Sequence, residues 1–103
     1  MSKLNGKWNL TVKTYMGDMR SVADFTVNGT ALTGLVTDAA SGNTANVDNG
    51  MVDGDHFSYA ITIVTPVGEM TNELAGSINA EGTILTGKSK NAMGEFEFEA
   101  VRV

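Results

Sequence analysis

The six residues GTALTG at positions 29–34 return almost unchanged as GTILTG at positions 82–87, which is 53 positions later in a chain of 103 residues. Each copy follows a run of alternating apolar and polar residues and a turn that contains Asn. Two alternating runs joined by such a turn are typical of a β-hairpin. Convergence on a common hairpin sequence is one explanation for the repeat. The other is an internal duplication, and we predict two similar halves of four strands each.

The composition indicates one folded domain that is rich in strands. A chain of 103 residues has room for a single domain, residues 1–103, with one hydrophobic core. Apolar residues make up 42% of the chain and charged residues 18%, which is typical of globular rather than disordered proteins. The chain holds twelve Gly and one Pro, so we expect strands joined by tight turns.

Charge, cysteine content and hydropathy argue against several classes of function. The net charge is −5 and the seven Lys and Arg are scattered, which disfavours nucleic acid or an anionic membrane as a partner. The absence of Cys and the presence of a single His disfavour disulfides, thiolate chemistry and transition-metal sites. The first residues lack the apolar core of a signal peptide, and no apolar run approaches the roughly 18 residues of a membrane span. We therefore expect a cytoplasmic protein without a metal or cofactor.

Alternation with a period of two residues continues along the whole chain, and no segment has a competing helical pattern. The alternation predicts eight strands, at residues 7–16, 19–27, 30–38, 44–52, 56–64, 69–78, 83–90 and 95–103. In the fourth strand it places Val47 and Met51 inward. Eight short strands joined in chain order are expected to close into an antiparallel up-and-down barrel, because closure removes the exposed edges of a sheet. A sandwich of two sheets is the alternative.

Alternate turns of an up-and-down barrel lie at opposite ends, and the two ends of this chain differ. The turns at residues 28–29, 53–54 and 79–82 are tight, so we predict that this end is closed. Four of the six methionines lie beside the connections at the other end, namely Met16, Met19, Met70 and Met93. Flexible thioether side chains adapt to irregular apolar shapes, which suits the mouth of a small-molecule site. Methionines that simply fill the barrel end are the alternative.

Trp8 follows Gly6 on the first predicted strand, and Arg102 lies on the last one at the same closed end. In these residues the chain resembles the calycin superfamily, which includes lipocalins, fatty-acid-binding proteins and avidins, and in particular short bacterial lipocalin-like barrels. The resemblance implies that Trp8 plugs the barrel base while Arg102 stacks on it, a favourable cation–π arrangement, and hydrogen-bonds nearby backbone. It also implies a cavity for an apolar ligand. The chain is shorter than lipocalins, and its short loops leave the size of that cavity open.

Polar residues at predicted inward positions are the candidates for ligand contact, because a buried polar group needs a partner. Tyr59 falls in the middle of the barrel, Asn72 near the mouth, and Asp38 at the rim. Glu69 and Arg20 are expected at the rim as well, with Arg20 facing outward. A carboxyl group at an apolar mouth can retain its proton near neutral pH and act as a general acid or base. A rim charge in water is the alternative.

Other reactive residue types have ordinary structural explanations. His56 adjoins a tight turn and is expected at the surface, and the neighbouring Asp53 and Asp55 lack the further oxygen ligands of a calcium loop. No serine stands in a nucleophile elbow or a Ser/His/Asp arrangement. Glutamates of the last strand are expected to pair with lysines of its neighbours across the outer face, Glu95, Glu97 and Glu99 with Lys13, Lys88 and Lys90.

Three functions are compatible with these patterns. The preferred one is the binding of a small apolar or aromatic molecule, with the four methionines as contact surface and Tyr59, Asn72 and Asp38 fixing its orientation. The first alternative is a cofactor-independent isomerase, cyclase or lyase with Asp38 or Glu69 as proton shuttle. The second is a filled barrel that serves as an interaction module or homo-oligomer subunit. Its contact surface would be formed by outward apolar residues, Val22, Leu35, Val64, Val101 and Val103.

Overall fold

A computed structural model of the protein describes residues 3–14, 17–65, 68–92 and 94–103. Within these ranges the chain forms strands and turns and contains no helix. The described residues therefore include no helix that could span a membrane. The strands are β1 (Gly6–Thr14), β2 (Gly17–Asn28), β3 (Ala31–Asp38), β4 (Thr44–Asn46), β5 (Asp48–Asp53), β6 (His56–Thr65), β7 (Gly68–Ile78), β8 (Ile84–Asn91) and β9 (Gly94–Arg102). They begin and end close to the predicted positions.

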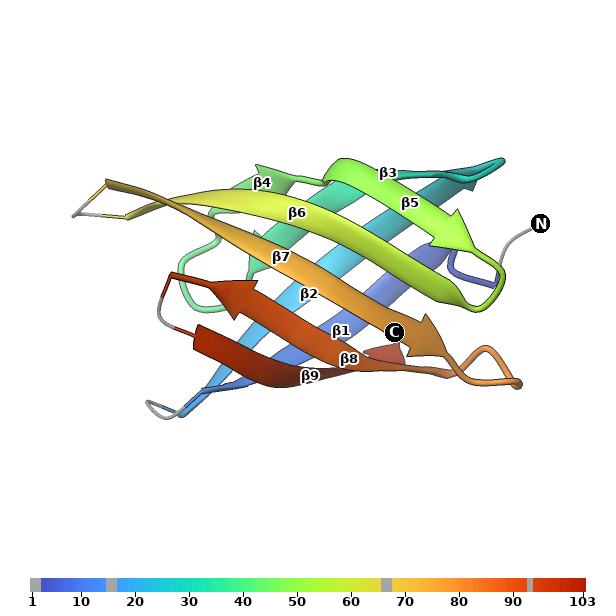
Figure 1. Ribbon diagram of the computed structural model, residues 1–103. Helices are drawn as coiled ribbons and strands as arrows, with labels where there is room; N and C mark the ends of the chain where they lie inside the picture. The colour runs from blue at the N-terminus through green and yellow to red at the C-terminus, as the bar shows by residue number, and fades with distance from the viewer. Residues whose placement is uncertain (1–2, 15–16, 66–67, 93) are drawn as a thin grey trace.

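The strands form a closed antiparallel barrel in up-and-down order (Figure 1). Strands β4 and β5 together take the place of one strand between β3 and β6, which makes the barrel eight-stranded. Pairing of β9 with β1 closes the sheet on itself. The predicted fold class is confirmed, and the two-sheet sandwich is excluded.

A β-bulge separates β4 from β5 and reverses the side on which the second half of this strand faces. Asn49 has a φ of 52°, and the pairing with β6 shifts between Asp48 and Met51. An extra residue in one strand turns every following side chain to the opposite face. Val52 is therefore buried, and Met51 is 63% exposed. The prediction that Met51 faces inward is wrong, whereas Val47, which precedes the bulge, packs against the core as predicted.

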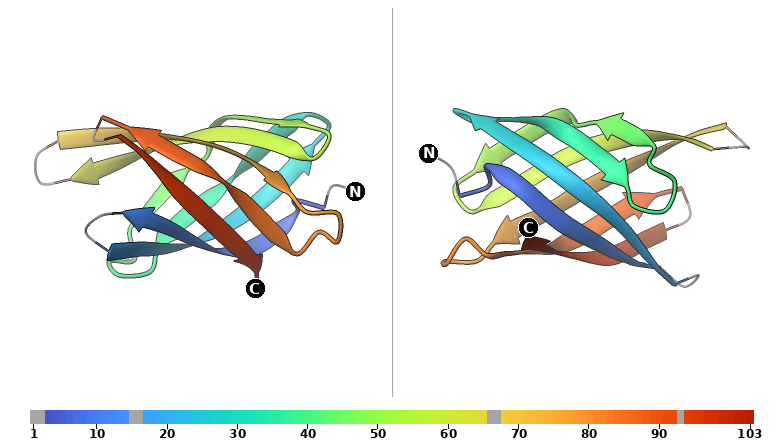
Figure 2. Two further views of the ribbon diagram at one scale, coloured as in Figure 1. Left: turned by 60° about the horizontal axis from the view of Figure 1, so that its bottom comes forward. Right: turned by 180° about the vertical axis from the view of Figure 1, so that it is seen from behind.

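The closed end is sealed by Trp8, and the first described residues of the chain, from Lys3, lie toward this end together with the C-terminus (Figure 2). Trp8 is completely buried, and its indole Nε1 donates a hydrogen bond to the carbonyl oxygen of Leu4 at 3.0 Å. The guanidinium carbon of Arg102 lies 4.2 Å from the centroid of the Trp8 ring. The three guanidinium nitrogens donate to backbone carbonyl oxygens, those of Lys3, Asn5 and Gly82. This is the arrangement that the calycin resemblance implied for the two side chains.

Aromatic side chains fill the barrel interior between the closed end and its middle. The ring of Tyr59 meets Phe25 edge to face at 5.3 Å between centroids and stacks on Phe57 at 6.2 Å. Phe57 in turn lies 6.2 Å from Phe98. All four side chains are at least nine-tenths buried, so this half of the barrel is a packed core.

The two copies of the repeated hexapeptide occupy matching places in the barrel. They lead into β3 and β8, the second strands of the hairpins β2–β3 and β7–β8, and both hairpins turn at the closed end. At the last glycine of each copy a Cβ atom would overlap the backbone oxygen of the paired strand, that of Asp24 at Gly34 and that of Ala75 at Gly87. The close approach of the paired strands therefore requires glycine at both positions.

Candidate functional site

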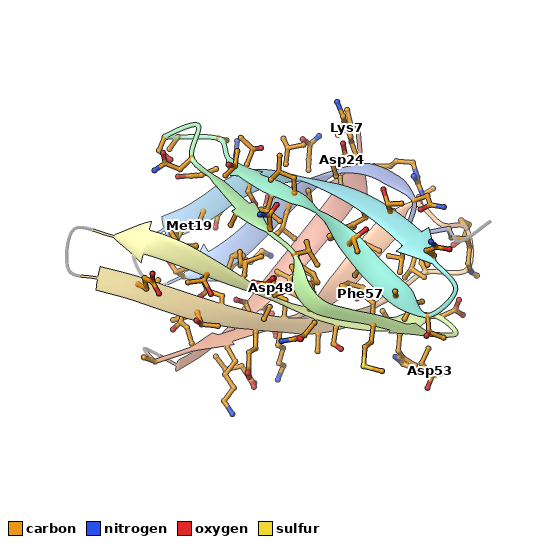
Figure 3. The ribbon with its side chains drawn as sticks, turned by 90° about the horizontal axis from the view of Figure 1, so that it is seen from above. Lys7, Met19, Asp24, Asp48, Asp53 and Phe57 are labelled. Carbon is orange, nitrogen blue, oxygen red and sulfur yellow. The ribbon has the colours of Figure 1, made fainter. Side chains whose placement is uncertain are left out.

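The open end of the barrel encloses a cavity of about 590 Å³. A volume of this order lies within the range of roughly 300–1,000 Å³ that is usual for small-molecule sites. In Figure 3, Met19 marks the open end and Phe57 the packed, closed end. Much of the cavity wall is apolar, and β1, β3, β6, β7 and β9 contribute the side chains of Leu10, Val12, Val36, Ile61, Leu74 and Phe96.

One wall of the cavity, formed by β7 and β8, carries three polar side chains at its open end. Asn72 is 7% exposed and Ser89 is 4% exposed, and both line the cavity. Lys90 on β8 pairs with Glu73 on β7 in antiparallel register. The next residue of β8, Asn91, therefore stands across from Asn72. Its amide nitrogen donates a hydrogen bond of 2.7 Å to Oδ1 of Asn72. We call the three side chains of Asn72, Ser89 and Asn91 the polar wall.

The opposite rim is organised by Asp38 at the end of β3. Its carboxylate accepts hydrogen bonds from the Ser41 hydroxyl at 2.7 Å and from the Ala40 backbone amide at 3.3 Å. The backbone of Asp38 also pairs with that of Asn43, donating to its carbonyl oxygen at 2.8 Å. Asp38 thus lines the cavity as its inward parity predicted, but its carboxylate is engaged in shaping the loop that leads to β4.

The wall of the barrel is split at the open end between β4 and β6. Strand β4 pairs with β3, whereas the register of β6 with β5 ends at the pair Ala60 and Asp48. Beyond Ala60, β6 pairs with β7. Residues on both sides of the split line the cavity, including Ala45 and Thr62.

The structure brings some of the predicted ligand-binding residues to the cavity and leaves others outside it. Met19 and Met70 line it together with Asn72, while Met16 and Met93 lie outside the described residues. Tyr59 pairs with Leu74, which lines the cavity, but is itself buried in the aromatic core and is not among the lining residues. Its hydroxyl has no hydrogen-bond partner among the described residues, and burial raises the pKa of Tyr59 far above its usual range.

Of the two other charged residues expected at the rim, Glu69 and Arg20, only Arg20 lines the cavity. Glu69 is exposed and precedes Met70, which faces inward, so Glu69 points to the outer face and is not among the residues that line the cavity. Arg20 was expected to face outward, yet it lines the rim. Arg20 stands at an outward position near the start of β2, from which its long side chain can reach the mouth.

Sequence reasoning missed four cavity residues that alternation alone could have identified. Ser89 and Asn91 continue the inward parity of Leu85 on β8, and Phe96 continues that of Phe98 on β9. Ser21 does the same for Ala23 on β2. Ser21, Ser89 and Phe96 lay within the predicted strands 19–27, 83–90 and 95–103 but were not considered as ligand contacts, whereas Asn91 was assigned to the turn after the seventh predicted strand.

The remaining predicted residues lie on the outer surface. Lys88 and Glu95 form one of the expected ion pairs, at 3.3 Å, and His56 is exposed. In the described part of the chain no group of three or more His, Asp or Glu side chains is placed to hold a metal ion. Of the outward apolar residues, Leu35, Val101 and Val103 are 41–70% exposed, Val22 is half-buried, and the side chain of Val64 lies outside the described set.

Comparison with known proteins supports the fold but names no family. No family model matches the sequence, and the comparison with curated proteins finds no match either. A solved structure of a redesigned β-barrel is similar with a TM-score of 0.74 and 13% identity, over 98% of this chain and 91% of the other. A second redesigned β-barrel, mFAP1, which is bound to DFHBI, is similar with a TM-score of 0.69 and 14% identity, over 98% and 95%. At these identities the likeness shows the barrel fold alone.

Proposed function

We propose that the protein binds one small apolar or aromatic molecule in the cavity at the open end of the barrel. The cavity itself carries this proposal. Protein interiors are packed so closely that voids larger than a water molecule are few, and the closed half of this barrel follows that rule. A space of about 590 Å³ in so small a barrel has the size and the largely apolar lining of a ligand site.

The methionines at the mouth supply adaptable contact surface in this proposal. Met19, on β2, is 55% exposed at the rim, and Met70, on β7, is half-buried in the cavity lining. Flexible thioether side chains of this kind can close over ligands of different shape. We include Met16 and Met93 in the proposed mouth on the basis of their positions in the sequence, with Asn72 and Asp38 as the groups that orient the ligand.

Two further observations support a binding barrel. A barrel of the same fold, mFAP1, is bound to the small molecule DFHBI. The stacking of Arg102 on Trp8 is also what a calycin-type barrel would show, and we propose a relation to that superfamily on this geometry. A cytoplasmic, single-domain protein is part of the same proposal.

Nothing in the cavity favours the acid/base alternative. The Asp38 carboxylate is engaged by Ser41 and Ala40, and Glu69 points away from the cavity. The filled-barrel alternative does not fit a chain with an open cavity of this size. Binding is therefore the one function that we propose.

The test is a titration with apolar dyes whose emission changes when they leave water. Ala45→Phe places an aromatic ring in the cavity, because Ala45 lines it from β4. Asn46→Phe is the matched control, since it adds the same ring to the next, outward-facing and exposed residue. We expect saturable one-to-one binding by the unmodified protein, a loss of affinity of about tenfold or more in Ala45→Phe, and little change in Asn46→Phe. Absence of saturable binding across the dye panel, or equal affinity in Ala45→Phe, would overturn the proposal.

A further inference from the structure

We propose that the polar wall is a hydrogen-bonding subsite that selects ligands with a neutral carbonyl group on an apolar or aromatic body. This inference rests on the proposed function and specifies the class of ligand. Its basis is the placement of two buried polar side chains, Asn72 and Ser89, in an otherwise apolar part of the cavity.

The amide of Asn72 is held in one orientation. Its Oδ1 accepts the hydrogen bond from Asn91, and Ile61 stands opposite it on β6. With the oxygen directed toward Asn91, the amide nitrogen is left as the available donor. The Asn91 contact therefore positions a donor without using it.

Two donors of the polar wall are left for a ligand. Among the described residues, neither the Asn72 amide nitrogen nor the Ser89 hydroxyl has a hydrogen-bond partner. Both side chains line the cavity, in contrast to Tyr59, whose unpaired hydroxyl is sealed within the aromatic core. Buried polar groups are nearly always paired in native proteins, so two accessible, unpaired donors at the same wall indicate an acceptor on the bound molecule.

The surroundings favour a neutral acceptor over an anion. The charged residues of the cavity lining are Arg20 on β2 and Asp38 on β3. They stand at the rim, whereas the polar wall is formed by β7 and β8. The whole chain carries a net charge of −5. A carboxylate would lose its hydration at the polar wall without gaining a cation there, whereas a carbonyl oxygen needs only the neutral donors that Asn72 and Ser89 present.

The experiment compares two probes, an acylnaphthalene dye and the same naphthalene without its acyl group. We expect the unmodified protein to bind the acyl dye about 3–10-fold more tightly, the range that corresponds to one or two net hydrogen bonds. This comparison needs no variant and therefore does not depend on the folding of one. Equal affinity for the two dyes would overturn the subsite while leaving the binding function intact. Absence of binding of either dye would overturn both.

Variants then assign the preference to the polar wall. Ser89→Ala and Asn72→Leu should each reduce the affinity for the acyl dye about 3–10-fold and change that for the unacylated dye less than about twofold. Ser21→Ala is the matched control, because Ser21 is a cavity-lining serine on β2, and it should change neither. A preference that survives in both Ser89→Ala and Asn72→Leu would overturn the assignment, with thermal unfolding used to confirm that each variant is folded.

Discussion

The closed and open ends belong to the same eight-stranded barrel, yet one is packed solid and the other holds a cavity. At the closed end Trp8 is completely buried, and Arg102 covers its ring while donating to three backbone carbonyl groups. At the open end β4 pairs with β3 but not with β6, and side chains surround about 590 Å³ of space. The difference indicates that the closed end stabilises the fold, whereas the open end provides the proposed ligand site.

The two ends should respond differently to the same kind of mutation. The contribution of a buried side chain to the free energy of unfolding rises with the number of atoms that contact it, because dispersion and burial depend on close neighbours. Side chains of the closed end are surrounded, whereas those of the cavity lining have neighbours on one side and open space on the other.

The largest effect is expected from Trp8→Ala. It removes the largest fully buried side chain together with the surface on which Arg102 stacks, and should lower the free energy of unfolding by about 3–5 kcal/mol or more. Because Trp8 is the only Trp, urea unfolding should be followed by circular dichroism. Trp8→Phe keeps a ring and should lose less. A cost below about 1 kcal/mol for Trp8→Ala would show that the closed end does not anchor the fold.

A matched pair of leucines tests the contrast between the two ends directly. Leu85 is 1% exposed and does not line the cavity, whereas Leu10 is 4% exposed and does. Leu→Ala substitutions cost about 2–5 kcal/mol depending on how completely the side chain is surrounded. We expect Leu85→Ala near the upper limit and Leu10→Ala near the lower one, measured by urea unfolding. Equal costs would contradict the contrast.

Tyr59→Phe should have a smaller effect, and of opposite sign. The Tyr59 hydroxyl has no described partner, so its removal avoids an unpaired buried group and should stabilise the protein by about 1 kcal/mol. Burial raises the pKa of Tyr59, so above the ordinary tyrosine pKa of about 10 only the unfolded chain releases this proton. The stability of the unmodified protein should therefore fall as the pH rises above that value, and the advantage of Tyr59→Phe should widen. A destabilised Tyr59→Phe variant would show that the hydroxyl has a partner.

Alternation in the sequence was sufficient to predict the barrel and most of its interior. A period of two residues assigns each side chain to one face. Tyr59 lies inside as predicted, and the alternate residues Phe57 and Ile61 on β6 lie inside with it, as does Phe98 on β9. The seal at the closed end followed from a resemblance that rests on Trp8 and Arg102. The alternation can be read from neighbouring residues of one strand, and the resemblance depends on two residue types, Trp and Arg, at particular positions.

The features that escaped prediction depend on how distant strands pair. The bulge at Asn49 is set by the register of β5 against β6, which the alternating pattern does not reveal, and it reversed the prediction for Met51. The hydrogen bond between Asn72 and Asn91 joins residues 19 positions apart and depends on the register of β7 and β8. The polar wall therefore became visible only in three dimensions.

Methyl NMR during titration with the acylnaphthalene dye tests the central claim, that the open end binds a small molecule while the closed end does not. Val12, Val36 and Ile61 carry methyl groups that line the cavity, whereas Leu4, Leu32 and Leu85 belong to the buried core away from it. We expect saturable shifts of the methyl signals of Val12, Val36 and Ile61, and only small changes of those of Leu4, Leu32 and Leu85. Shifts confined to the closed end, or to the outer residues Val101 and Val103, would contradict it.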